Sequence, residues 1–343
     1  MTFSNIRVLL LGGVAVGMMA TSAMAQEYTF RIQSSDPAGN TNFLLQKEWA
    51  EMVEKKTDGR VEVEMLPVET IVAHSETQDA VAAGIIDGHF TDTSYFAGKD
   101  PAFGLIANPV GAWASPQQMF DFMYNGGGAE LMNEMLNPYG LQFLGATTPG
   151  LEAFVSKVPL DGVDDLKGLK LRAPEGMVQK VFAAAGAAPV NLPGSEVFTA
   201  LDKGVIDAAD YNTFSTNEAQ GLHDIAKHPV YPGFHSMPLI EVSVNKVKWD
   251  SLPEDLQKAM SESVQEFAQY QAETVHKHDQ EAAEAAAASG KVTIHDWSDE
   301  ERAKFRSIAR TQWEEAASAS ANSQKVYDTL ISYLDANGLL AKD

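Results

Sequence analysis

The chain has 343 residues, of which 45% are apolar, so it is long enough for two domains and apolar enough to give each a buried core. Its formal net charge of −22 argues against a nucleic-acid partner, because phosphate backbones are bound by an excess of Lys and Arg. It contains no cysteine, which excludes disulfides, thiol nucleophiles and metal sites built on thiolates.

Residues 1–25 are predicted to be a secretory signal peptide. Arg7 precedes an apolar run over residues 8–20, and small residues then lead to Ala23-Met24-Ala25 before Gln26. This A-x-A ending is typical of a signal-peptide cleavage site. The alternative is a membrane anchor, but the run is short for a span of about 20 residues and contains several glycines. We therefore expect an exported mature chain that begins near Gln26.

The first part of the mature chain has the pattern of a β-α-β unit. Apolar and polar residues alternate over Glu27–Ser34 and again over Arg60–Leu66, which predicts two strands. Between them, apolar residues occur at helical spacing over Asn42–Thr57, and Asp58-Gly59 ends the helix. Two strands joined by a helix are expected to be parallel neighbours in one sheet.

A sequence repeat points to two similar lobes. Residues 75–90 (SETQDAVAAGIIDGHF) and 195–210 (SEVFTALDKGVIDAAD) share six identities at an offset of 120. Each copy predicts an N-capped helix, a glycine that ends it, and a strand that enters a core. We interpret the copies as equivalent elements of two α/β lobes, with chance similarity as the alternative.

Two such lobes would form a cleft, and ligands in α/β proteins bind beyond the carboxyl ends of strands. The first copy leads into Thr91–Tyr95, and the second ends in Asp210 followed by Tyr211 and Asn212. Both segments are therefore predicted to form walls of the cleft.

The C-terminal part is predicted to be helical. A helix from Pro253 to about Ser289 would be roughly 50 Å long and would span both lobes. Two further helices are expected at Asp299–Ala321 and Ser323–Asn337. The predicted organisation is a first lobe over 26–146 with a return strand at about 236–250, a second lobe over 147–235, and helices over 251–343 that pack on both lobes.

Arg172 is the candidate anion-binding residue. It lies at the end of a short apolar run (LKLRA), where a strand should lead into a loop. The planar guanidinium matches a carboxylate or a sulfonate with two parallel hydrogen bonds. The alternative is a surface arginine paired with Asp164 or Asp165, and the residues alone leave both interpretations open.

Motifs of several enzyme classes are absent from the sequence. There is no G-x-S-x-G, H-E-x-x-H, phosphate-binding G-x-x-x-x-G-K or G-x-G-x-x-G opening a helix. We therefore expect a binding protein rather than an enzyme, and an exported hydrolase or lyase with a two-lobed cleft is the alternative.

The order of these segments resembles a known family. A signal peptide, a β-α-β unit, GLKLRAPEG, EVFTALDKGVIDAADY and a long C-terminal helix are similar to the periplasmic substrate-binding subunits of TRAP transporters, the DctP-type family. The resemblance implies a two-lobed periplasmic binding protein that captures a small organic anion and delivers it to TRAP membrane subunits. It also implies that Arg172 clamps the ligand carboxylate. Parts of the family form homodimers through the C-terminal helices. A binding protein that serves a sensor kinase instead of a permease is a further interpretation of this chain.

The details resemble the branch that binds 2-oxo acids, lactate and other monocarboxylates. AADYN and VNKVKWDSLPEDLQ are the segments that carry this similarity. It implies a Ca²⁺ or Na⁺ ion beside the carboxylate, held by Asp210 and the carbonyl of Tyr211, with no other cofactor. Asp210 stands where the branch has a longer Glu, and an expected glutamine near Pro149–Glu152 is absent. An aromatic carboxylate or a sulfonate is the alternative ligand.

The predicted ligand site draws on both lobes and on the aromatic loop 229–238. Its residues are Arg172, Asp210, Tyr211 and Asn212 from the second lobe, Ser34, Thr93 and Tyr95 from the first, and Phe234 and His235 as a cap.

Overall fold

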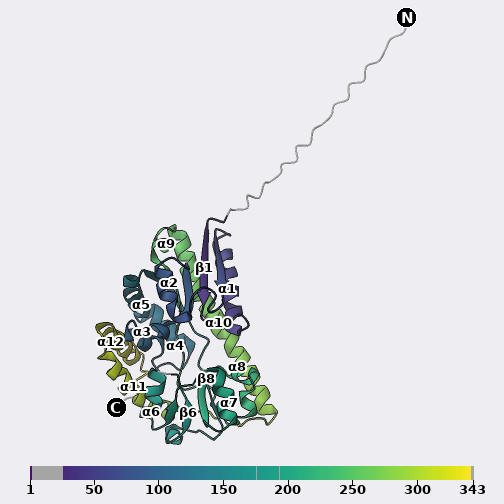
Figure 1. Cartoon of the computed structure of the whole chain (residues 1–343), viewed down its shortest axis with the longest axis vertical. Helices are drawn as coiled ribbons and strands as arrows, with labels where there is room; N and C mark the ends of the chain where they lie inside the picture. Colours follow the sequence, from purple (N-terminus) through teal and green to yellow (C-terminus); the bar gives the residue numbers. More distant parts are fainter. Residues whose placement is uncertain (2–25, 175, 193, 341–343) are drawn as a thin grey trace.

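The computed structural model describes residue 1 and residues 26–340, apart from residues 175 and 193. It is an α/β protein with two lobes, one above the other in Figure 1, and a long helix that runs beside both. This confirms the predicted fold class. The predicted signal peptide, apart from residue 1, lies outside the described residues. None of the described helices combines the length and the apolar character that a membrane crossing requires.

The first lobe is built on a five-stranded sheet in the order β2-β1-β3-β9-β4. β1 pairs in parallel with β2 and β3, as the β-α-β pattern predicted, whereas β9 is antiparallel to both of its neighbours. The strands are β1 (Tyr28–Ser34), β2 (Val61–Leu66), β3 (Gly88–Asp92), β4 (Leu141–Thr147) and β9 (Ile240–Asn245). The helices are α1 (Thr41–Lys56), α2 (Thr77–Ala82), α3 (Pro101–Ala107), α4 (Pro116–Asn125), α5 (Gly128–Leu136) and α9 (Lys246–Asp250).

The second lobe is built on a four-stranded sheet in the order β5-β8-β6-β7. β6 is parallel to β7 and β8, and β5 is antiparallel to β8. The elements of this lobe are β5 (Ala153–Ser156), β6 (Lys170–Arg172), α6 (Met177–Ala184), β7 (Ala188–Val190), α7 (Val197–Asp202), β8 (Ala208–Asn212) and α8 (Phe214–Ala219).

The two copies of the repeat occupy equivalent places in the two lobes. α2 and α7 are each followed by a glycine with φ of +70°, Gly84 and Gly204. Ile86 and Ile206 are then both fully buried, and β3 and β8 pair in parallel with β1 and β6. The predicted N-caps were wrong, because each helix continues from a 3-10 turn and has no side-chain cap. The two copies of the sequence repeat therefore form structurally equivalent elements of the two lobes.

Because the two glycines share one conformation, they should respond equally to substitution. A Cβ added at Gly84 or Gly204 would meet no atom within 4 Å, so only the left-handed backbone opposes a side chain there. We expect Gly84→Ala and Gly204→Ala each to lower the free energy of unfolding by about 1–2 kcal/mol. Urea denaturation of both variants measures this, and a large difference between them would contradict the equivalence.

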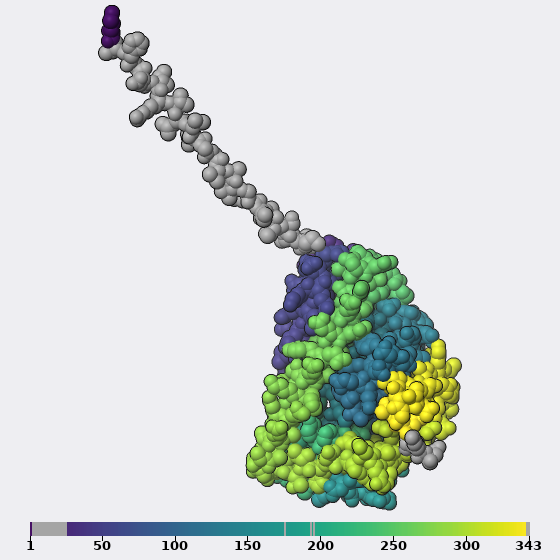
Figure 2. All heavy atoms as spheres, turned by 180° about the vertical axis from the view of Figure 1, so that it is seen from behind, coloured from purple at the N-terminus to yellow at the C-terminus, as the bar shows by residue number. Residues whose placement is uncertain are grey.

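The C-terminal helices join the lobes. α10 (Glu254–Ala288) has 35 residues, close to its predicted bounds. Its first half packs into the core of the first lobe through residues that include Met260 and Phe267, and its last turns pack against Ala153 and Phe214 of the second lobe. α11 (Asp299–Ala317) and α12 (Ala321–Ala336) follow on the other side of the molecule. In Figure 2 the green α10 runs down this face of the molecule, from the top to the lower left.

Candidate functional site

A cavity of about 440 Å³ lies between the lobes. The ends of β6 and β8 contribute its second-lobe wall, and the turn after β3 contributes the first-lobe wall. The polar and charged residues that line it are Asp92, Ser94, Tyr95, Asn108, Glu152, Arg172, Asp210, Tyr211 and Ser236. Its position agrees with the general rule that ligands bind beyond the carboxyl ends of strands.

Arg172 is held in this wall by two backbone carbonyls. Its Nε donates to Leu192 O at 3.1 Å and its Nη1 donates to Asp210 O at 2.7 Å. The alternative pairing does not occur, because Asp164 accepts from Lys167 and Asp165 accepts from backbone N–H groups. Among the described residues, no carboxylate forms an ion pair with Arg172 within 4.0 Å, although its charge acts on Glu152 and Asp210 at longer range.

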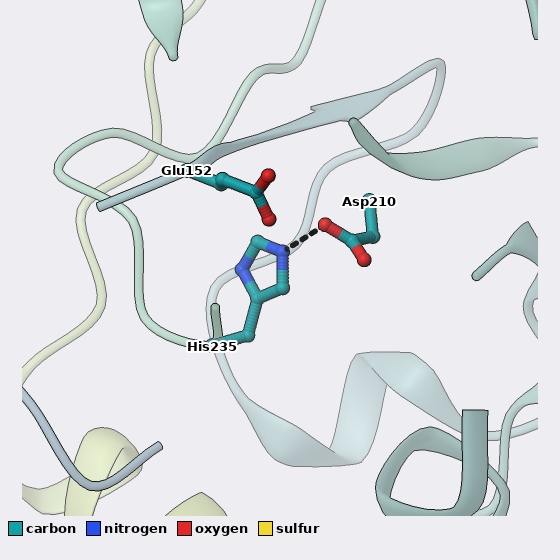
Figure 3. Close-up of side chains that lie close together, drawn as sticks. All are labelled: Glu152, Asp210 and His235. Carbon is teal, nitrogen blue, oxygen red and sulfur yellow. Dashed lines mark hydrogen bonds and ion pairs between the residues drawn. The ribbon is translucent and has the colours of Figure 1, made fainter. Parts of the chain in front are cut away.

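Glu152, Asp210 and His235 form a compact cluster beside Arg172. One potential ligand atom of each lies within 4.8 Å of the others, and His235 Nε2 is hydrogen-bonded to Asp210 Oδ1 at 2.8 Å. Figure 3 shows the imidazole directed between the two carboxylates. The other ring nitrogen, Nδ1, is buried and has no partner among the described residues. His235 was predicted to cap the ligand, and in the structure its side chain contacts Asp210 instead.

Glu152 is brought into the cluster by the crossing of two chain segments. Its backbone N–H donates to Ser236 O at 2.9 Å. The segments approach so closely that a Cβ on Gly233 would lie 1.9 Å from the carbonyl oxygen of Glu152. Glu152 was not among the predicted site residues. The sequence held one signal for its role: an acidic residue in the segment Pro149–Glu152, where a glutamine was expected.

The two carboxylates of the cluster have opposite pKa shifts. Removal from water, followed by repulsion from Asp210, raises the pKa of Glu152 well above its usual range. Burial also opposes the ionised form of Asp210, but His235, a hydrogen bond with Glu152 and the charge of Arg172 together outweigh it and lower the pKa of Asp210. The ionised form of Glu152 is therefore poorly compensated, and a positive charge placed beside it would stabilise that form.

The first-lobe wall presents Asp92 and Tyr95. Asp92 Oδ1 accepts from Ser94 N at 2.7 Å and caps the 3-10 turn over Thr93–Phe96. Burial is the largest cause of its raised pKa, and the charge of Glu241 adds to it. Tyr95 is 43% exposed and contacts His74 edge to face at 4.6 Å between ring centroids.

Besides His235, four predicted site residues are not among those that line the cavity. Thr93 Oγ1 donates to the buried Glu241 at 2.8 Å, and Ser34 Oγ accepts from Asp36 N at 2.9 Å. Phe234 stacks on Trp297 at 3.7 Å within the core, so its predicted position over the ligand was wrong. Asn212 lies at the end of β8, where its side chain accepts from Thr213 N at 2.8 Å.

Comparisons with known proteins agree with this architecture. Residues 33–319 match the model of the family described as bacterial extracellular solute-binding protein, family 7. A solved TRAP periplasmic solute-binding protein from Rhodobacter sphaeroides, in an apo open state, is 66% identical. It covers 92% of this chain and 100% of its own, with a TM-score of 0.86.

Two further proteins have named ligands. A monocarboxylate 2-oxoacid-binding periplasmic protein from Nostoc sp. is 31% identical over 231 residues, which is 67% of this chain but 63% of that protein. A TRAP periplasmic solute-binding protein from Pseudoalteromonas atlantica, solved with sodium and pyruvate, is 25% identical. It covers 91% of this chain and 95% of its own, with a TM-score of 0.76.

Proposed function

The chain belongs to family 7 of the bacterial extracellular solute-binding proteins, the periplasmic subunits of TRAP transporters, and we propose that its ligand is a monocarboxylate bound by Arg172. Members of this family bind small organic anions and work with membrane components; it is a transport family and not an enzyme family. Within that class, a 2-oxo or 2-hydroxy acid is the ligand we propose first.

The state of Arg172 is the observation that carries this proposal. Two carbonyls fix the guanidinium on the cavity wall, and no described carboxylate oxygen lies within 4.0 Å of its nitrogens. In a chain with a net charge of −22 an anion is repelled overall, so its capture needs a local positive group. A forked guanidinium also selects planar carboxylates by geometry. The lobes would close on the ligand by a hinge motion in the segments that connect them, between β4 and β5 and between α8 and β9.

A thermal-shift screen of carboxylates and sulfonates tests the proposal. A ligand present at a hundredfold excess over its Kd stabilises the folded protein by about 2.7 kcal/mol, which is a measurable rise in Tm. We expect monocarboxylates to raise the Tm of the wild type and to have no such effect on Arg172→Ala. The absence of any carboxylate response, or an equal response of both proteins, would count against the proposal.

The cluster fits a hard cation beside the carboxylate. Ca²⁺ and Na⁺ prefer oxygen ligands, and Glu152 and Asp210 offer two carboxylates near the backbone of Tyr211. These three residues would hold the ion, with the carbonyl of Tyr211 as the third ligand, and the ion would supply positive charge next to the anion. The relative with sodium and pyruvate supports this extension. His235 would orient Asp210 through the bond at Oδ1.

The proposed cation site leads to a separate prediction. Calcium added to chelator-treated protein is expected to raise the Tm even without an organic anion, because it relieves the repulsion between Glu152 and Asp210. Glu152→Gln should reduce that calcium-dependent rise, since one charged ligand is lost. Glu284→Gln, which removes an exposed carboxylate from α10, is the control and should respond like the wild type. Equal responses of all three proteins would exclude Glu152 as a ligand.

A further inference from the structure

The walls of the cavity carry more negative charge than a simple anion requires. Asp92 of the first lobe, Glu152 of a crossing segment and Asp210 of the second lobe all line it. Arg172 is the single Lys or Arg among the described residues that do so. Glu152 and Asp210 have His235 and the proposed cation as partners, whereas Asp92 lies on the other lobe.

Asp92 has acceptor capacity that the protein leaves unused. An ionised carboxylate has two oxygens and no hydrogen-bond donor. Oδ1 of Asp92 caps the turn through Ser94, and no Lys, Arg or His of the described part of the chain lies within 4.0 Å of it. Its neighbours add to the imbalance, because the charges of Glu241 and of Asp36 act in the same region. Burial raises the pKa of Asp36 to about 6 and also raises the pKa of Asp92, so a hydrogen-bond donor from the ligand would stabilise the ionised form of Asp92.

We propose that the ligand carries a hydrogen-bond donor, a hydroxyl or an ammonium group, in addition to its carboxylate, and that Asp92 accepts it. The inference rests on the proposed function, since the carboxylate is the group that Arg172 binds in the same cavity. A ligand atom that faces the ionised carboxylate of Asp92 must donate, because two acceptors repel each other. An oxo group offers an acceptor alone, so a 2-oxo acid leaves Asp92 unpaired when the lobes close.

The other polar groups of the wall do not make this selection. The hydroxyl groups of Tyr95 and Ser236 can each donate or accept, so they tolerate either kind of ligand. A cavity of about 440 Å³ also lies within the size range of pockets for ligands with more atoms than a three-carbon acid. Asp92 is therefore the specificity-determining residue of the first lobe, and Arg172 that of the second.

The test is calorimetry with straight-chain carboxylates of increasing length, each as matched oxo, hydroxy and amino versions with the substituent at each carbon in turn. For the best chain length, the hydroxy or amino version should bind the wild type at least about tenfold more tightly than the oxo version, because closure over an oxo group would leave the Asp92 acceptor unpaired, which is costly. In Asp92→Asn this preference should disappear, because the amide can donate to an oxo group. Asn retains the capping oxygen, so the turn is preserved.

Two comparisons make the outcome decisive. Asp79→Asn removes an exposed carboxylate from α2 of the same lobe, and it should keep the wild-type preference. A larger loss for amino than for hydroxy ligands in Asp92→Asn identifies an ammonium group, and equal losses identify a hydroxyl. If carboxylates bind through Arg172 but the hydroxy and amino versions bind no more tightly than the oxo version, the inference about Asp92 is wrong and the proposed function stands. Failure of every carboxylate to bind overturns the proposed function as well.

Discussion

Replacing Arg172 by alanine is expected to weaken anion binding by a factor of roughly 10² to 10³, because removal of one partner of a buried ion pair costs about 3–5 kcal/mol. The ligand carboxylate would enter a cavity whose walls already carry Asp92, Glu152 and Asp210. Without the guanidinium, these carboxylates would face a further negative charge. Calorimetry with the tightest carboxylate from the thermal-shift screen measures the loss.

Arg172→Lys should also bind poorly, although it keeps the positive charge. The guanidinium is fixed by donating from two nitrogens to the carbonyls of Leu192 and Asp210. A lysine ammonium lacks the planar fork, so it cannot make both of these bonds and a bidentate contact to the ligand. For Arg172→Ala, the control for the change in net charge is Arg310→Ala, which removes a half-buried arginine from α11. Wild-type affinity in either Arg172 variant would exclude the clamp.

The fold was predictable because its signals are local and periodic. Alternation gave β1 and β2, and helical spacing gave α1 and α10 to within a few residues. Gly84 and Gly204 marked equivalent turns, because a positive φ favours glycine wherever it occurs. Arg172 was identifiable for a related reason: a charged residue at the end of a buried strand lies where cavities form.

Tyr95, Asp210 and Tyr211 were also predicted and line the cavity, whereas the positions of several other side chains depended on contacts that no local pattern encodes. Thr93 alternates with the cavity-facing residues, yet its hydroxyl bonds to Glu241, which is 148 residues away in the chain. Phe234 and His235 are adjacent in the chain, but Phe234 stacks on Trp297 in the core. His235 is hydrogen-bonded to Asp210. Glu152 reaches the cavity because two segments cross at Gly233. Each outcome is decided by tertiary packing.

The contact that displaces Thr93 is part of a fully buried polar network in the first lobe. His89 Nε2 lies 2.6 Å from Glu241 Oε1, and both side chains are 0% exposed. His89 Nδ1 lies 3.1 Å from Thr77 Oγ1, and Thr93 Oγ1 donates to Glu241 Oε2. The network joins β3 to β9 where β3 leads into the turn that carries Tyr95. It therefore supports both the sheet and the first-lobe wall of the cavity.

His89→Ala is expected to lower the free energy of unfolding by about 3–5 kcal/mol, because it leaves the Glu241 carboxylate buried with Thr93 as its remaining partner. Urea denaturation measures the loss. Asp250→Ala, which breaks the exposed Lys246–Asp250 pair on α9, should cost less than about 1 kcal/mol. The double variant His89→Leu/Glu241→Leu should regain most of the stability, since apolar groups can replace a buried pair at little cost. A His89→Ala effect no larger than that of Asp250→Ala would show that the network does not stabilise the lobe.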